Sequence, residues 1–452
     1  MVPIMDKILE KLFNDIEIAK DDIIGVLDHI WDNPELGYRE WKTHAYLKQK
    51  YEELGLSVSE VGDIPGFFVD IDTGRPGPKI AVFGEMDGLK IPSHPECDKT
   101  TGAVHACGHH TQCASVYGVA RGLVDSEVLS ALNGSVRLFA VPCEELVSGE
   151  FYENLKRDGK IKFYGGKKEF IRKGLLDDVD MAIMIHGGAK GFGLNKGCNG
   201  SINKKYVFTG KTAHVAGARN SKNALSAAML AMNAANALRE RFTDGDLMRY
   251  YATVVPDSEA PGNIPAKVTV VAGVRALTTK TLEKVNEWVD LAYAGAAISS
   301  GCDLTIDNEV GYYPRIEDKN LQEVFLETAR YLYKDEDIYV DLPAAAGCTD
   351  MGDVSMLMPV CHAFVGDGGP AGHSAEFKVV DKYLKGVVAA KLQAGVIYAL
   401  LKDGAVRAKK VKENYVPTFK DKEDYLAKTE KLSFKGDAVK YNEDGTITVT
   451  IR

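Results

Sequence analysis

The chain has 452 residues, enough for about three average domains or for one large domain that carries an insertion. Its 45% hydrophobic and 26% charged residues are typical of a globular protein and exclude the disordered and fibrous classes. A formal net charge of −9 lacks the basic footprint of nucleic-acid-binding proteins, so we expect no nucleic-acid partner.

The first half of the chain alternates helical and strand patterns. An amphipathic N-terminal helix leads into a helical region that breaks at Asn33-Pro34 and ends at Gly55. Short apolar runs then alternate with helical stretches, which predicts a mostly parallel sheet with helices on both faces. In chain order, the predicted elements are strand 79–84, helix 111–124, strand 135–141, helix 168–175 and strand 181–185, and a later strand 360–365 is followed by helix 382–402.

The middle of the chain follows a different pattern, the order β-α-β-β-α-β of a ferredoxin-like unit. The predicted elements are strand 201–209, helix 222–241, strands 250–255 and 267–275, helix 281–298 and strand 302–310. We therefore predict an α+β domain at 199–310, inserted into an α/β domain made of 1–198 and 311–404. The remaining residues, 405–452, are interpreted as a solvated C-terminal appendage with a hairpin turn at Asp444-Gly445.

Cellular location is inferred from what the sequence lacks. The N-terminus has acidic residues within its apolar pattern and no cleavage site typical of a secretory signal. None of the eight cysteines forms a C-x-x-C pair, and the longest apolar stretches are shorter than the roughly 20 residues of a membrane-spanning helix. We expect reduced thiols, a cytoplasmic location and no membrane partner.

Residues suited to metal chemistry follow several predicted strands. In open α/β sheets, ligands bind beyond the carboxyl ends of the strands. The residues concerned are Glu85 and Asp87 after the first strand, Glu144 and Glu145 after the second, His186 after the third, His373 after the fourth, and Cys107 and His109 in the loop HACGHH. A single histidine after a strand is more often structural, but convergence of several such ends predicts a metal site.

The residue types limit the metal and its chemistry. Thiolate, imidazole and carboxylate together favour zinc, with manganese, cobalt or nickel as alternatives, and there are enough candidate ligands for two ions. Adjacent Glu144 and Glu145 cannot both point the same way, so one can bind metal while the other acts as a general base. No G-x-S-x-G or Walker A motif is present, and a cysteine nucleophile at Cys107 would leave the other candidates unexplained.

At these positions the chain resembles a family of two-metal peptidases and amidohydrolases, peptidase family M20, which includes aminoacylases, auxin-conjugate hydrolases and aminobenzoyl-glutamate hydrolases. The resemblance extends from about residue 20 to 400. Within the family, the chain looks most like the aminobenzoyl-glutamate hydrolase branch. The matching motifs are WDNPELGYREWKTHAYLKQKYEELG (31–55), GEMDGL (84–89), HACGH (105–109), CEE (143–145), IHGG (185–188), GKTAHVAG (210–217), PGNIPAKVTVVAGVRA (261–276), TDMGDVSMLMP (349–359) and AGHSAEF (371–377).

The resemblance implies a role for each matching residue. Cys107 would bridge two divalent ions, and the terminal ligands would be His109, Glu145, His186 and His373. Glu144 would be the general base. Asp87 would hold an imidazole ligand in the correct tautomer, although a turn or cap residue is the alternative interpretation.

In the predicted insertion, the resemblance assigns His214, Asn263 and Arg275 to the substrate. His214 would reach across a homodimer interface formed by this domain and, with Asn263, stabilise the oxyanion. Arg275 would pair with a substrate carboxylate, or would be an ordinary exposed strand charge.

Two positions depart from the family pattern: His110 replaces the usual Asp or Asn after HACGH, and Gln112 replaces a histidine of the auxin-conjugate members. The roles of His110 and Cys143 stay open. The sequence therefore predicts a two-metal amidohydrolase that cleaves the amide bond of a small N-acyl amino acid or an aminobenzoyl-glutamate-like substrate. The alternatives are a metal-dependent dipeptidase or carboxypeptidase and a non-enzymatic metal-binding protein.

Overall fold

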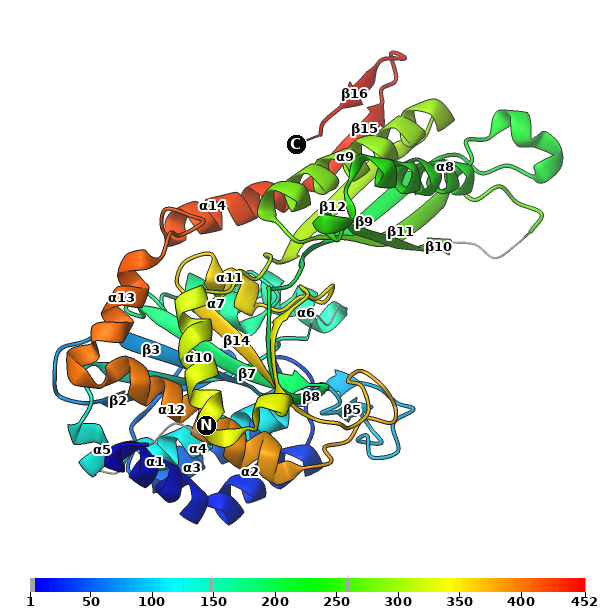
Figure 1. The fold of residues 1–452 in the computed structure, drawn as a ribbon. Helices are drawn as coiled ribbons and strands as arrows, with labels where there is room; N and C mark the ends of the chain where they lie inside the picture. The colour runs from blue at the N-terminus through cyan, green and yellow to red at the C-terminus, as the bar shows by residue number, and fades with distance from the viewer. Residues whose placement is uncertain (1–4, 125, 146–148, 257–260, 452) are drawn as a thin grey trace. The chain divides into compact units, whose positions relative to one another are not determined.

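The computed structural model describes residues 5–124, 126–145, 149–256 and 261–451. These residues form two compact units (Figure 1). Unit 1 consists of Met1–Lys196, Ile316–Pro343 and Asp353–Thr418, and unit 2 of Gly197–Arg315, Ala344–Gly352 and Phe419–Arg452. We predicted an inserted domain at 199–310 and an appendage after residue 404. In the structure, the insertion spans Gly197–Arg315, and unit 2 also includes 344–352 and 419–452.

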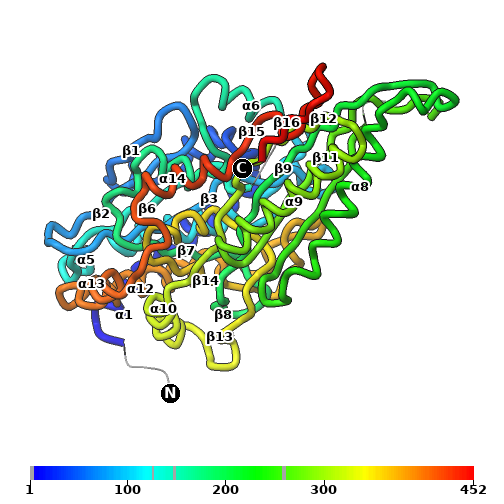
Figure 2. Tube along the Cα trace, turned by 90° about the horizontal axis from the view of Figure 1, so that it is seen from above, coloured from blue at the N-terminus to red at the C-terminus, as the bar shows by residue number. Residues whose placement is uncertain are grey.

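Unit 1 is built on an eight-stranded mixed sheet with the order β1-β2-β6-β3-β7-β14-β8-β13, which can be followed in Figure 2. The strands are β1 (Val58–Glu60), β2 (Phe67–Asp72), β3 (Lys79–Glu85), β6 (Ser135–Val141), β7 (Met181–Gly188), β8 (Lys190–Asn195), β13 (Ile338–Leu342) and β14 (Val360–Asp367). The four central strands β6, β3, β7 and β14 run parallel. The predicted α/β class is confirmed, and the parallel core places four carboxyl ends at one edge.

Helices cover both faces of this sheet, as predicted. The helices of unit 1 are α1 (Lys7–Ile18), α2 (Lys20–Asp32), α3 (Trp41–Glu53), α4 (His109–Leu123), α5 (Ser126–Ser130), α6 (Glu150–Arg157), α7 (Gly166–Arg172), α10 (Lys319–Leu332), α12 (Ala389–Leu401) and α13 (Val406–Asn414). One face buries aliphatic side chains of β3 and β6 under α1, α2, α4 and α12. On the other face, stacked Phe83 and Phe139 meet Phe170 of α7. A short two-stranded sheet, β4 (Leu89–Lys90) and β5 (Ala103–Val104), lies outside this core.

The predicted helix 382–402 is formed by a π-helical turn, Tyr383–Val388, followed by α12. The segment Tyr383–Leu401 is long and apolar enough to cross a membrane, but 78% of its apolar window is buried inside the structure. Because α12 packs against α1, α4 and α10 within the main core, we interpret it as a core helix.

Unit 2 has the predicted β-α-β-β-α-β order. Its elements are β9 (Gly200–Thr209), α8 (Ala224–Ala237), β10 (Arg249–Pro256), β11 (Lys267–Ala276), α9 (Thr279–Ser300) and β12 (Asp303–Tyr312). The antiparallel strands have the order β10-β11-β9-β12, that of a ferredoxin-like sheet, and both helices pack on one face. A short helix, α11 (Met351–Ser355), begins in unit 2 and ends in unit 1.

The expectation of a solvated appendage at 405–452 is wrong. Helix α13 belongs to unit 1, while α14 (Lys422–Leu432), β15 (Lys435–Tyr441) and β16 (Ile447–Val449) belong to unit 2. Strand β15 pairs with β12 and extends the sheet of unit 2 to six strands, with Ala438 and Val439 buried. The predicted turn at Asp444-Gly445 joins β15 to β16.

Candidate metal centre

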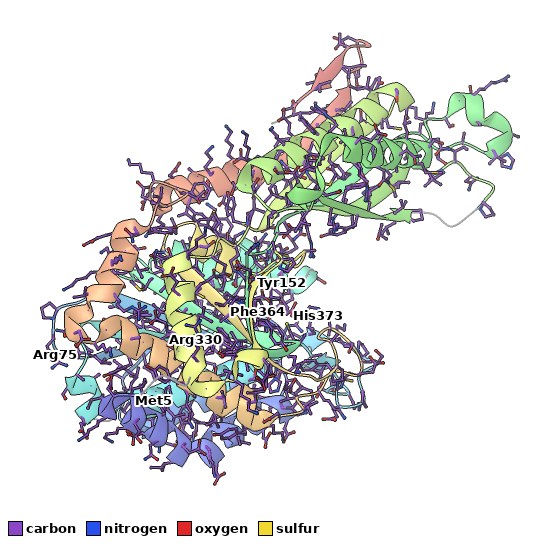
Figure 3. The ribbon with its side chains drawn as sticks, viewed as in Figure 1. Met5, Arg75, Tyr152, Arg330, Phe364 and His373 are labelled. Atoms are coloured by element: carbon purple, nitrogen blue, oxygen red, sulfur yellow. The ribbon has the colours of Figure 1, made fainter. Side chains whose placement is uncertain are left out.

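The carboxyl ends of four parallel strands bring the predicted ligands of unit 1 together. Strand β3 ends at Glu85 and leads to Asp87, and β6 leads to Glu144 and Glu145. His186 lies on β7 beside Phe364 of β14, and β14 leads into the loop that carries His373. Figure 3 labels Phe364 and His373, and the ring of His373 is 58% exposed. The other predicted ligands are buried or nearly so.

Among the residues that the structure describes, three groups of side chains could each hold an ion, because the ligand atoms within each group all lie within 4.8 Å of one another. The groups are Cys107, His109 and His186; Cys107, Glu145 and His373; and Glu85, His109 and Glu144. Cys107 belongs to two groups, as a bridging thiolate would. The first two groups contain all five predicted ligands, although their binding of metal stays a prediction.

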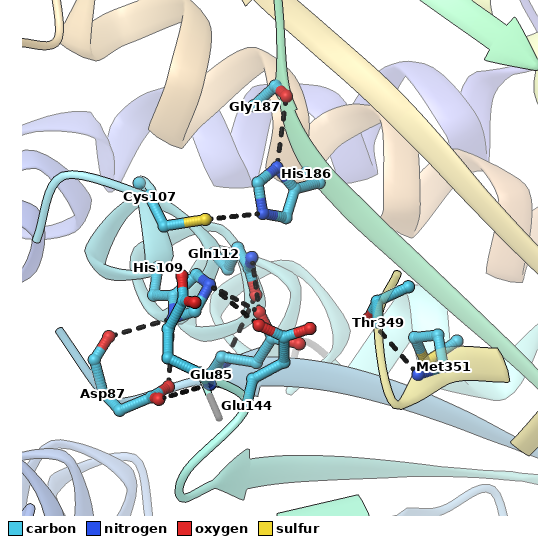
Figure 4. A network of polar contacts seen from close by, with 12 residues as sticks. Glu85, Asp87, Cys107, His109, Gln112, Glu144, His186, Gly187, Thr349 and Met351 are labelled. Carbon is cyan, nitrogen blue, oxygen red and sulfur yellow. Dashed lines mark hydrogen bonds and ion pairs between the residues drawn. The ribbon is translucent and has the colours of Figure 1, made fainter. Parts of the chain in front are cut away.

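The loop HACGHH presents two of these ligands from the start of α4. Gly108 precedes the helix with φ 87°, a left-handed conformation that suits glycine. His109 is therefore the first helical residue, and Cys107 lies just outside the helix with its Sγ 3.4 Å from His186 Nε2 (Figure 4). Burial raises the pKa of the Cys107 thiol far above its ordinary value, so a thiolate here needs a cation beside it.

Asp87 orients two neighbouring groups at once. Its Oδ1 lies 3.0 Å from Nδ1 of His109, and its backbone oxygen lies 2.9 Å from the same nitrogen. Two acceptors facing Nδ1 keep a proton on that nitrogen, so His109 would bind a metal through Nε2, which would give up its own proton to the incoming cation. Asp87 Oδ2 also accepts the backbone N–H of Glu145 at 2.8 Å, a contact that the sequence did not predict.

The turn that carries the two glutamates is held from both sides. Glu40, which is fully buried, accepts the backbone N–H of Cys143 at 2.8 Å. Cys143 itself has φ 50°, a strained conformation for a residue with a side chain, and its thiol packs against Tyr152. Cys143 is thus part of this turn. Glu144 is buried, with Oε2 3.9 Å from His109 Nε2.

The remaining ligands have distinct electrostatic environments. The carboxylate of Glu145, whose Oε1 lies 3.3 Å from Nε2 of His373, raises the pKa of that imidazole. Burial, followed by the neighbouring His109, lowers the pKa of His186 to about 4, so its ring is neutral at pH 7. His373 also has φ 62°, and a strained backbone at a candidate ligand is typical of functional sites.

These residues fit a pair of divalent ions. Nε2 of His109 and Oε1 of Glu145 are buried without a hydrogen bond of acceptable geometry, although each lies near another polar atom. Buried polar atoms are normally satisfied, and a cation would satisfy both. The mixture of thiolate, imidazoles and carboxylates matches the preference of zinc and neighbouring transition ions.

Of the residues behind His109, the sequence singled out Glu85 as a candidate but not its contacts. Glu85 is buried with its Oε2 3.0 Å from His109 Nε2, and it pairs with Lys167 of α7. Gln112, noted only as a departure from the family pattern, donates from Nε2 to Glu85 Oε2 at 2.9 Å. His110 lies outside the three groups, buried with its ring 5.0 Å from that of Trp31. The position of Glu85 after a predicted strand indicated that residue, but nothing in the sequence indicated Lys167.

Unit 2 contains the three residues expected to bind substrate. His214 and Asn263 form an isolated antiparallel bridge, and both are exposed. Arg275 lies on β11, half-buried, and donates from Nη1 to the backbone oxygen of Ala346 at 3.2 Å. His214 and Asn263 thus lie close together, and the substrate roles of all three residues stay predictions.

Comparisons with known proteins find a matching family and related proteins. The family described as peptidase family M20/M25/M40 matches residues 81–392. Thermostable carboxypeptidase 2 of Saccharolobus solfataricus is 33% identical over 40% of this chain and 42% of its own length. One of the subunits of p-aminobenzoyl-glutamate hydrolase from Escherichia coli is 26% identical over 65% of this chain and 59% of its own length. The chain thus spans less than two thirds of the length of both curated relatives.

A solved structure has the same fold. It is a Bacillus subtilis protein whose crystal structure is described as that of a dinuclear metal-binding peptidase of the M20 family. The alignment has a TM-score of 0.67 and 20% identity, and it covers 85% of this chain and 99% of the other.

Proposed function

The chain belongs to peptidase family M20/M25/M40, and we propose that it is a two-metal amidohydrolase that cleaves a small N-acyl amino acid or an aminobenzoyl-glutamate-like substrate. The observation that supports this proposal best is the pair of ligand groups that share Cys107. The metal-binding character of the Bacillus subtilis relative and the amide substrate in the name of the Escherichia coli relative agree with it.

Cys107, His109, Glu145, His186 and His373 would hold the ions, with zinc favoured over manganese, cobalt and nickel. Bound there, two divalent ions would supply Lewis-acid chemistry, making water a better nucleophile and the amide carbonyl a better electrophile. Their positive charge would also stabilise the Cys107 thiolate, which burial otherwise disfavours.

Glu144 would act as the general base. Glu40 and Asp87 accept hydrogen bonds from the backbone of the residues on either side of Glu144, so the backbone that carries its carboxylate is held in place. Glu144 would take a proton from the attacking water and return it to the nitrogen of the leaving amine. Adjacent Glu145 points to His373 instead, which separates the ligand from the base.

The residues of unit 2 would complete the reaction. His214 and Asn263 would donate hydrogen bonds to the oxyanion, and Arg275 would pair with the substrate carboxylate. We propose that the protein is a cytoplasmic homodimer joined through unit 2, with His214 acting on the site of the partner protomer. Exposed apolar side chains on the helices of unit 2, Met229, Leu230 and Leu291, are consistent with such an interface.

The decisive experiment compares Glu144→Gln with Glu145→Gln. Glu144→Gln should lower kcat at least about 100-fold, the usual contribution of a general base, while elemental analysis still finds two ions per chain. Glu145→Gln is the matched control, because it should lose metal as well as activity. A Glu144→Gln protein with full activity would refute the assignment of the base.

A carboxypeptidase is the second candidate, because the Saccharolobus relative with that name is 33% identical over 40% of this chain. A panel of N-acyl amino acids, aminobenzoyl-glutamate, free dipeptides and longer peptides separates the two. Selective cleavage of C-terminal residues from peptides would favour the carboxypeptidase. Metal-replete protein that cleaves no member of the panel would favour a non-enzymatic metal-binding role.

A further inference from the structure

A buried ion pair that the proposed mechanism does not use lies beside the candidate metal centre. Lys167 of α7 contacts Oε1 of Glu85 at the end of β3, and the side chains of both residues are at most 1% exposed. Fully buried lysines are rare in proteins unless they are paired, because removing the charge from water is energetically costly. A buried pair this close to the candidate ligands points to a role in the neighbouring site.

Glu85 lies close enough to the candidate ligands to bind the same ion, but both of its carboxylate oxygens already accept hydrogen bonds from other side chains. The candidate ligand atoms of Glu85, His109 and Glu144 all lie within 4.8 Å of one another. Lys167 engages Oε1 of Glu85, and Gln112 donates to Oε2 at 2.9 Å. A carboxylate held at both oxygens by cationic and amide donors is a poor ligand compared with Cys107 or His186, whose donor atoms face the centre (Figure 4).

The same ion pair connects the segments that carry the ligand and the base. Gln112 and His109 lie on the first turn of α4, and Lys167 lies on the first turn of α7. The start of α7 packs closely on the chain just before Glu144. Gly166 donates to the backbone oxygen of Cys143 at 3.1 Å, and a Cβ on Gly166 would lie only 1.9 Å from the backbone oxygen of Pro142.

We propose that Glu85 is a positioning residue, which Lys167 holds outside the coordination shell so that it fixes His109 relative to the loop carrying Glu144. This inference rests on the proposed function, since it takes His109 as a ligand and Glu144 as the base. The ion pair keeps a third carboxylate beside the centre without letting it replace a ligand. The ligand set therefore stays at five side chains although a sixth is within reach.

The test uses the full-length protein loaded with Co²⁺, whose visible absorption reports the number and type of its ligands. Lys167→Met leaves the Glu85 carboxylate without its cation, so Glu85 should move onto an ion and change the absorption bands. The double variant Lys167→Met/Glu85→Gln removes both charges and should restore the wild-type bands and two ions per chain. In the double variant, kcat should still fall about 10- to 100-fold with little change in KM, because the base is less well placed.

Lys168→Met is the matched control. Lys168 is the next residue of α7, is equally buried and lies 3.7 Å from Asp353, so this variant should lose stability but keep the wild-type Co²⁺ bands.

Two results would overturn the inference. The first is a double variant with altered bands or a missing ion, because Glu85 would then be a ligand. The second is a Lys167→Met variant with wild-type bands and wild-type kcat. Because the bands are read without substrate, they decide the position of Glu85 even if no amide is hydrolysed. Wild-type protein that binds no Co²⁺ would overturn the proposed centre itself, and the inference with it.

Discussion

At the scale of single residues, the candidate centre depends on carboxylates that each serve two partners. Asp87 accepts from the ring of His109 through Oδ1 and from the backbone of Glu145 through Oδ2. Glu85 is shared in the same way between Lys167 and Gln112. An ionised carboxylate can do this because both of its oxygens are acceptors, whereas an amide has only one.

Asp87→Asn should therefore weaken metal binding. One of its two contacts would face an NH₂ group, so either His109 or the turn at Glu145 would lose its orientation. We expect the affinity for the ions to fall about 10- to 100-fold, as measured by competition with a chelator. Asp70→Asn is the control, because Asp70 forms a bidentate pair with Arg137 on β6 and contacts none of the candidate ligands. Equal metal affinities in the two variants would contradict the role of Asp87.

At the scale of elements, the strands with a clear hydrophobic pattern could be predicted from the sequence, and a strand without such a pattern could not. Strands β3, β6 and β7 were predicted because each is a short apolar run before polar residues. Strand β15 was missed because its sequence KGDAVKY is mostly polar, and only its pairing with β12 buries Ala438 and Val439. Residues 1–4 of the predicted N-terminal helix lie outside the described residues, and α1 begins at Lys7.

The same reasoning explains which parts of the site could be predicted. Histidines and cysteine after strands are distinctive residues, so Cys107, His186 and His373 could be selected from the sequence. Lys167 could not, because a lysine on a short helix is normally exposed to solvent. Its burial depends on Glu85, which precedes it by a long stretch of chain and meets it only in the folded sheet.

Helix α1 is attached to the C-terminal part of unit 1 by an ion pair that titrates in acid. Glu17 accepts from Lys391 and Tyr383, each at 2.6 Å, and these hydrogen bonds lower its pKa below the ordinary 4.5. Its contribution to stability is therefore complete above pH 4.5 and is lost as the pH falls through the folded-state pKa.

Glu17→Gln should accordingly lower the free energy of unfolding at pH 7 by at most about 1 kcal/mol, because the pair is partly exposed. The difference from wild type should shrink below pH 4.5, and thermal unfolding at several pH values measures it. The exposed Glu10 on the same helix provides the control substitution Glu10→Gln. A difference that grows in acid would contradict the assignment.

At the scale of the whole molecule, two units are each assembled from separate pieces of chain. Unit 2 takes its fifth and sixth strands from the segment after Phe419, so the ferredoxin-like sheet is extended on the β12 edge. An unpaired strand edge presents free N–H and C=O groups that promote aggregation. Strand β15 thus protects β12.

Deletion of residues 435–452 should expose that edge. We expect a lower Tm and soluble aggregates in size-exclusion chromatography, with the metal content of unit 1 unchanged. Deletion of 447–452 alone is the control, since it removes β16 but leaves β15 on β12, and it should cause a smaller loss. If the longer deletion left the protein as stable and monodisperse as wild type, the protective role of β15 would be wrong.

The distribution of the candidate ligands along the chain also affects when the centre can form during biosynthesis. Cys107, His109 and Glu145 emerge from the ribosome early, His186 follows, and His373 comes only after the whole insertion has been translated. A nascent chain that stops before β14 would lack His373, and it would also lack α12, which packs on the helix that begins at His109. If these residues bind two ions as proposed, full loading would require a chain whose translation has passed His373, and truncated products would lack a complete centre.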